Sequence, residues 1–211
     1  MTIEKILDDV LDSRSKVKII RLFISKRDDF IASGNDIARL IGLTPPATHT
    51  SLKVLCDQGI LKRDIVGRQH IYRLNISNRI VKDILKPAFL KEVLIKEDIK
   101  DFLIQRIREY KVSTFIVSLI LYGSLARGNT HQTSDCDVAV VVKNTQAKKE
   151  IEDLFIEKIS TEFSGYFGIS LDAYIKTYEE FLERLKKRLT PVSTLIKSYI
   201  VLYGKDPVEY R

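Results

Sequence analysis

The stretch from Ile120 to Val142 reads ILYGSLARGNTHQTSDCDVAVVV and joins two apolar runs through a polar segment. Both runs are rich in β-branched residues and have the length of strands. Asp135 and Asp137 stand two positions apart at the start of the second run. Because residues i and i+2 of a strand project from the same face, we expect these two carboxylates to lie side by side.

The same stretch carries residue types that suit phosphate. Paired carboxylates repel each other unless a cation lies between them. Mg²⁺ takes oxygen ligands and bridges to phosphates, so we expect a pair of Mg²⁺ ions at Asp135 and Asp137. Gly123 allows the backbone to approach a ligand closely, and a helix starting near Ser124 would direct free N–H groups at an anion. Arg127 adds a guanidinium group, so the stretch predicts a nucleoside triphosphate site.

The order G-S-x-A-R-G and then S-D-x-D, flanked by apolar runs, resembles the minimal nucleotidyltransferases of the DNA polymerase beta superfamily. The resemblance implies transfer of a nucleoside monophosphate from an NTP to an acceptor, with release of pyrophosphate. It implies a mixed α/β domain holding two Mg²⁺ ions. The expected nucleotide-binding residues are Gly123, Ser124, Arg127 and Ser134. An isolated Gly-Ser pair would indicate only a turn, and an isolated D-x-D only a solvated strand end.

A third carboxylate comes from a later apolar run, Ile169–Ile175, which carries one charge at Asp172. A lone aspartate in an apolar strand is costly unless it is paired. Asp172 stands where the family places its third metal-binding carboxylate. The resemblance therefore implies a catalytic and metal-binding set of Asp135, Asp137 and Asp172; alternatively, Asp172 forms a salt bridge with a neighbour.

The basic charge is concentrated in the first half of the chain. Residues 1–75 contain 13 Lys and Arg against 9 Asp and Glu, and residues 76–111 contain 9 against 6. Residues 112–211 contain 13 of each sign. A basic segment beside a neutral one favours a nucleic-acid contact in the first half.

The pattern of residues 1–75 predicts helices, then a hairpin around Gly67. Asn35 is an expected N-cap, Thr44-Pro45-Pro46 is an expected helix start, and the expected elements are helices at 3–11, 17–24, 35–42 and 44–58 and strands at 60–65 and 70–74. The segment SLKVLCDQGILKR, followed by IYRLN, is similar to ArsR-like and MarR-like winged helix-turn-helix regulators.

Such a module places its second helix in the major groove of double-stranded DNA and directs its hairpin at the backbone or the minor groove. The resemblance implies DNA contacts through Thr44, His49, Thr50, Lys53, Arg68 and Gln69. It also implies a homodimer. Winged helices also serve as protein-docking modules, and basic residues near Gly67 would suit a solvated turn.

We therefore expect an α+β chain with three parts. Residues 1–75 form a winged helix-turn-helix DNA-binding domain, residues 76–111 a helical connector, and residues 112–211 a nucleotidyltransferase domain with a mixed sheet. The connector is expected either to form the dimer surface or to pack against the catalytic sheet, because apolar helix positions such as Phe102 and Leu103 need a partner. Pro87 is expected to interrupt it.

The composition sets limits on location. The chain has 211 residues, two cysteines far apart in sequence and a charged N-terminus. No apolar run approaches the roughly 20 residues that span a bilayer. We expect a cytoplasmic protein without a membrane partner or a disulfide framework.

Three functions remain open from the sequence. The first is an enzyme that modifies an unknown acceptor, which could be a protein, a nucleic acid or a small molecule. The second is a transcription regulator whose nucleotidyltransferase domain senses nucleotide without turnover. The third is an antitoxin-like partner of a toxin.

Overall fold

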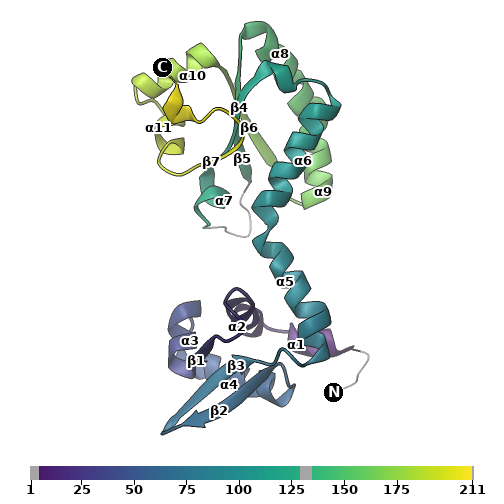
Figure 1. Ribbon diagram of the computed structural model, residues 1–211, viewed down its shortest axis with the longest axis vertical. Helices are drawn as coiled ribbons and strands as arrows, with labels where there is room; N and C mark the ends of the chain where they lie inside the picture. Colours follow the sequence, from purple (N-terminus) through teal and green to yellow (C-terminus); the bar gives the residue numbers. More distant parts are fainter. Residues whose placement is uncertain (1–4, 129–134, 211) are drawn as a thin grey trace. The chain divides into compact units, whose positions relative to one another are not determined.

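The chain forms two compact units in a computed structural model that describes residues 5–128 and 135–210. The units comprise residues 1–95 and 96–211. The predicted α+β class is confirmed, with helices and two sheets, one of them mixed (Figure 1). The boundary between the units falls inside the predicted connector 76–111, whose first helix packs with the first unit and whose last helix packs with the second. No helix among the described residues is both long enough and apolar enough to cross a membrane.

The first unit combines helices with a three-stranded antiparallel sheet in the order β1-β3-β2. Its elements are α1 (Ile6–Val10), α2 (Arg14–Ile24), β1 (Ile31–Ser33), α3 (Gly34–Ile41), α4 (Pro45–Asp57), β2 (Leu61–Val66) and β3 (Gln69–Leu74). The inner face of α4 is fully buried at Thr48, Leu52 and Leu55. This order of helices followed by a hairpin is the one expected for a winged helix-turn-helix.

Two details of the first unit differ from the prediction. Ser33, not Asn35, caps α3, because the Ser33 hydroxyl accepts a hydrogen bond from the Asp36 N–H at 3.2 Å. The three-residue strand β1 was not predicted. It is too short to show an alternating pattern, and its position depends on pairing with β3, a contact between residues about forty positions apart.

The prediction that Pro87 interrupts the connector helix is wrong. A π-helical segment, η2 (Val81–Leu85), runs directly into α5 (Lys86–Val93). A proline in a regular helix clashes with the carbonyl four residues earlier, and the wider π turn relieves that clash. The α5 helix then packs with the first unit, where Glu92 Oε2 accepts from Arg21 Nε at 2.8 Å.

The second unit is built on a four-stranded sheet in the order β6-β5-β4-β7. Only β5 and β6 are parallel. The elements are α6 (Ile95–Glu109), η3 (Ser113–Phe115), β4 (Ile116–Leu121), α7 (Gly123–Arg127), β5 (Cys136–Val142), α8 (Thr145–Leu154), η4 (Phe155–Ile159), α9 (Ser160–Phe167), β6 (Leu171–Thr177), α10 (Tyr178–Lys186), α11 (Val192–Leu195), β7 (Ile200–Gly204) and η5 (Pro207–Glu209).

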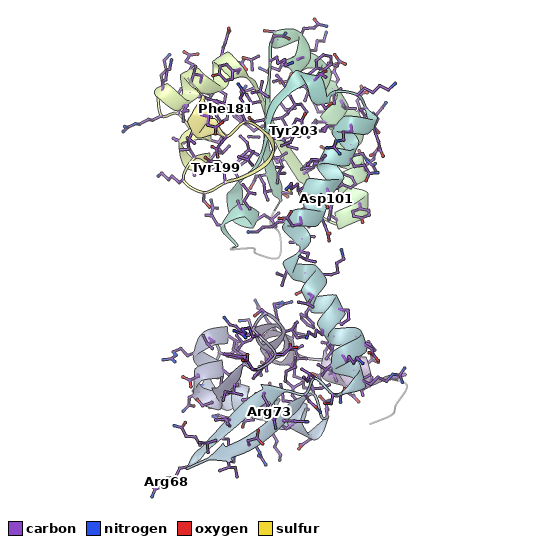
Figure 2. All side chains as sticks on the ribbon, in the orientation of Figure 1. Arg68, Arg73, Asp101, Phe181, Tyr199 and Tyr203 are labelled. Carbon is purple, nitrogen blue, oxygen red and sulfur yellow. The ribbon has the colours of Figure 1, made fainter. Side chains whose placement is uncertain are left out.

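Helices cover both faces of this sheet, with α6 and α9 on one side and α10 and α11 on the other (Figure 1). Successive side chains of β5 point alternately to the two helical layers that cover the sheet. Ala139 and Val141 join Phe181 of α10 in one apolar cluster, and Val138 and Val140 are equally buried on the opposite face (Figure 2 labels Phe181). A strand buried on both faces explains the unbroken apolar run that follows Asp137.

The segment from α8 to α9 follows an apolar repeat of four residues. Ile151, Phe155, Ile159 and Phe163 are all at most 1% exposed. A four-residue repeat exceeds the 3.6 residues of an α-helical turn, and the π-helical η4 keeps these side chains on one face. The same wide turn leaves Ile156 outside, at 74% exposed.

The apolar positions of α6 have partners within their own unit. Leu103 is fully buried, and the Phe102 ring meets the Phe163 ring edge-to-face with centroids 5.7 Å apart. Of the two roles expected for the connector, packing within the catalytic domain is the one that Phe102 and Leu103 fulfil. A homodimer stays a prediction without this surface to support it.

Candidate functional site

The predicted carboxylates come from one end of the sheet in the second unit. Here β4 ends and both β5 and β6 begin. Asp137 and Asp172 are register partners in the parallel β5–β6 pair, so their side chains leave the same face of the sheet. Asp135 lies directly before β5, and its carboxylate accepts a hydrogen bond from the Ser170 hydroxyl. Sequence reasoning did not identify Ser170.

The three carboxylates interact electrostatically. Burial raises the pKa of Asp137, and the negative charges of Asp172 and then Asp135 raise it further. Arg127 opposes this shift. Asp172 is exposed and Asp137 is partly buried. Such a group of carboxylates favours protonation or a bound cation.

As placed, the carboxylates are not gathered around one point. Among residues 5–128 and 135–210, no group of three or more His, Cys, Asp or Glu side chains is arranged to hold a metal ion. Asp135 is turned toward Ser170. The donor chemistry suits Mg²⁺, since all three groups supply carboxylate oxygens and their mutual repulsion leaves a negative charge to neutralise.

Gly123 lies against the carboxylate of Asp137. Its φ is +77°, and a Cβ built on it would overlap Asp137 Oδ2. Sequence reasoning assigned this glycine to the approach of a ligand. The structure adds a nearer reason, which is room for the carboxylate itself. The Tyr122 N–H also donates to the Asp137 carbonyl at 3.0 Å, so β4 and β5 are joined directly at the site.

The short helix α7 carries the predicted phosphate-binding residues. Ser124 is partly buried and Arg127 is exposed. The α7 helix ends at Gly128 with a φ of +74°, and Lys96 Nζ donates to the Ala126 carbonyl at 3.1 Å. Lys96 was not predicted. Ser134 lies outside the described residues.

A pocket of about 280 Å³ opens beside Gly123 and Arg127. Its other lining residues are Tyr122, Thr190, Pro191, Thr194 and Leu195. The last four precede or belong to α11 and were not predicted as part of a site. No local motif identifies them, because only the packing of α11 on the sheet brings them to Gly123. Burial raises the pKa of Tyr122 to about 12, so its hydroxyl stays protonated at neutral pH.

The predicted DNA-contacting residues all lie at the surface of the first unit. Thr44, the N-cap of α4, is exposed, and so are His49, Thr50 and Lys53 of α4 and Arg68 and Gln69 of the hairpin. Arg68 projects from the hairpin tip (Figure 2). The His49 ring packs against Gly34 at the start of α3, where a Cβ would approach it to 2.5 Å. By contrast, the Arg73 guanidinium pairs with Asp64 at 2.9 Å.

Comparison with known proteins bears on the second unit. Residues 103–201 match the model of the nucleotidyltransferase domain family. This domain begins within α6 and ends in β7, and so contains the sheet and the three carboxylates. A candidate protein adenylyltransferase, MJ1305 of Methanocaldococcus jannaschii, is 26% identical over 109 residues, which is 52% of this chain and 72% of that protein.

Solved structures are only distantly similar. The AntR antimony-specific transcriptional repressor is 24% identical with a TM-score of 0.34, over 44% of this chain and 76% of its own. A toxin–antitoxin structure with AMP-PNP is 15% identical with a TM-score of 0.32, over 51% of this chain and 74% of its own. Similarity at this level does not distinguish one function from another.

Proposed function

We propose that the second unit transfers a nucleoside monophosphate from an NTP to a hydroxyl group of an acceptor and releases pyrophosphate. The observation that carries this proposal is the in-register pair Asp137 and Asp172 beside Gly123. The match of residues 103–201 to the nucleotidyltransferase family supports it.

Asp135, Asp137 and Asp172 would hold two Mg²⁺ ions together with the triphosphate. When bound, these ions neutralise phosphate charge and lower the pKa of the attacking hydroxyl. The raised pKa of Asp137 supports this role, because the site carries more negative charge than it can stabilise alone. To bind a metal ion, the Asp135 carboxylate would give up the hydrogen bond that it accepts from the Ser170 hydroxyl.

The chain's own residues would orient the reactants. Arg127 and the α7 backbone would contact phosphate oxygens, together with Ser124 and Ser134. The pocket beside Gly123 is smaller than the roughly 300–1,000 Å³ that encloses a drug-sized ligand, so it would take only part of the nucleotide. An oxygen–phosphorus bond forms from the acceptor, the bond to pyrophosphate breaks, and Asp172, the most exposed member of the register pair, accepts the hydroxyl proton.

The acceptor class we favour is a protein hydroxyl. The name of the relative from Methanocaldococcus jannaschii supports this choice, since it describes transfer of an adenylyl group to protein. By the same reasoning we favour ATP as the NTP.

The first unit is proposed to bind double-stranded DNA through α4 and the β2–β3 hairpin. The exposure of Lys53 and Arg68 supports this second function. It would make the chain either a DNA-bound transferase or a regulator that senses nucleotide without turnover. An antitoxin-like role beside a toxin fits the same architecture. In each case the DNA-bound form would be a homodimer, as in ArsR-like and MarR-like modules.

One experiment distinguishes the transferase, the sensing regulator and the antitoxin-like role. Purified protein is incubated with α-labelled ATP, Mg²⁺ and cell extract, and protein-bound label is measured. The enzyme reading predicts label that depends on Asp137. Binding of ATP without any label transfer supports the sensing regulator, and transfer to one co-purifying small protein supports the antitoxin-like role.

A further inference from the structure

The outer edge of β6 is open for hydrogen bonding. β6 pairs through all seven of its residues with β5, without a bulge, and in the described part of the chain no strand lies on its other side. The opposite edge strand, β7, joins β4 with a register shift between Leu119 and Ile120. Bulges protect sheet edges, whereas a long regular edge is a template for another strand.

The direction of the free backbone groups follows from the β5–β6 ladder. The Cys136 N–H donates to the Ser170 carbonyl at 2.8 Å. The even-numbered residues of β6 therefore turn their N–H and C=O groups toward β5. Leu171, Ala173 and Ile175 turn theirs outward, and no hydrogen bond to these outward groups occurs among the described residues.

A groove of about 410 Å³ lies along this edge and is lined by those same three residues. Asp172 also lines it, which connects the groove to the carboxylates. Across from β6, the π-helical turn η4 presents Ile156, and the end of α8 presents Glu152 and Asp153. The groove thus combines free backbone groups, an apolar contact and an acidic rim.

Resting on the proposed transfer to a protein hydroxyl, we propose that the β6 edge binds an extended segment of the acceptor polypeptide as an added strand. Side chains alternate between the faces of a strand. The hydroxyl residue faces the side of Asp172 and Asp137. Its neighbours face the groove, where an apolar side chain meets Ile156 and a basic one meets Asp153. The segment is therefore basic and alternates hydroxyl residues with apolar or basic ones.

The acidic rim favours this occupant over a second copy of the chain. Glu152 pairs with Lys148 at 4.0 Å, so the acidic character of the rim rests on Asp153 and Asp172, which would be brought toward their own copies if two β6 edges paired. A basic segment instead neutralises them. Backbone hydrogen bonds supply binding in such strand addition, and the alternating pockets supply selectivity.

The probe is the heptapeptide Val-Thr-Lys-Tyr-Val-Thr-Lys, labelled with a fluorophore and titrated with the full-length protein. Two analogues carry N-methyl groups, one on the two lysine amides and one on the two threonine amides. In a strand only alternate amides face the neighbouring strand. We expect one analogue to bind at least tenfold more weakly and the other to bind like the parent.

Variants test the same surface from the protein side. Ala173→Pro removes an outward N–H and keeps the ladder to β5, and proline is tolerated on an edge strand. Ile156→Lys removes the apolar contact and repels a basic peptide, without touching the sheet. Val208→Lys is the matched control, since Val208 is 68% exposed in the same unit. We expect at least tenfold weaker binding for the first two variants and unchanged binding for the control.

Amide hydrogen exchange locates the bound peptide. In the free protein we expect the amides of Leu171, Ala173 and Ile175 to exchange faster than those of Asp172 and Tyr174, and we expect bound peptide to slow them. No binding of the parent peptide at about 1 mM, or wild-type affinity in both Ala173→Pro and Ile156→Lys, overturns the proposal. Calorimetry with a non-hydrolysable ATP analogue and Mg²⁺ is run in parallel. Absence of nucleotide binding contradicts the proposed function. The peptide-binding results alone test whether the β6 edge binds an added strand.

Discussion

Asp137 of β5 and Asp172 of β6 are directly paired in a parallel ladder, and the charge of Asp172 helps to raise the pKa of Asp137. Replacing one of the two aspartates would make the sheet more stable, because their repulsion raises the free energy of the folded state when both are ionised. The pair is therefore the feature of the second unit that a structural role explains least.

The first prediction concerns this cost. The pKa of Asp137 is raised above its ordinary value of 3.8, so the native state binds more protons than the unfolded state just above that pH. Stability then falls as the pH rises through this window. Asp137→Asn should raise the melting temperature at pH 7 in EDTA, and the gain should disappear as the pH falls below about 3.8.

The control for this prediction is Asp101→Asn. Asp101 is exposed on α6, an element that carries none of the three carboxylates (Figure 2). The Asp101→Asn substitution should leave the melting temperature nearly unchanged. A lower melting temperature for metal-free Asp137→Asn would show that the carboxylate stabilises the fold.

The second prediction compares two glycines of α7. Gly123 and Gly128 both have a positive φ, but only at Gly123 would a Cβ meet another group, the carboxylate of Asp137. Gly128→Ala should cost about 1–2 kcal/mol from backbone strain alone. Gly123→Ala should cost more and should also weaken Mg²⁺·ATP binding in calorimetry. Equal unfolding free energies for the two variants would mean that Asp137 adjusts freely.

The third prediction concerns a buried hydrogen bond that fixes the C-terminal segment. The Tyr210 hydroxyl donates to Ser118 Oγ at 2.6 Å, and Ser118 Oγ donates to the Lys205 carbonyl. Ser118→Ala leaves both partners unpaired and should cost about 1–3 kcal/mol by chemical denaturation. Adding Tyr210→Phe to Ser118→Ala should cost less than the sum of the two single changes. Full additivity would show that the hydrogen bond does not contribute.

The fourth prediction concerns DNA. The double variant Lys53→Ala, Arg68→Ala should bind duplex DNA more weakly, with a flatter dependence on salt, since phosphate contacts release counterions. Lys26→Ala, Arg27→Ala removes the same charge from an exposed loop outside α4 and the hairpin. Electrophoretic shifts over a salt series compare the two. Identical salt slopes would contradict a specific contact through α4 and the hairpin.

Sequence reasoning succeeded where the chemistry is local. The proline start of α4 appears as predicted, because it depends on residues a few positions apart.

The features that sequence reasoning missed depend on distant packing. Ser170 reaches Asp135 across the β5–β6 pair, and Thr190 lines the same pocket as Gly123 because of the position of α11. The π turn before Pro87 is a compromise between one proline and a continuous helix. No pattern within the helix itself distinguishes that outcome from a break.

The most direct test of the proposed transfer compares wild-type protein with Asp137→Asn and Asp172→Asn. Each is incubated with α-labelled ATP, Mg²⁺ and cell extract, and protease-sensitive label is measured. We predict labelled protein with the wild type and at least a hundredfold less with either variant, while both variants remain folded by circular dichroism. Equal labelling by Asp137→Asn would contradict the account, and so would the absence of both label and Mg²⁺·ATP binding in the wild-type protein.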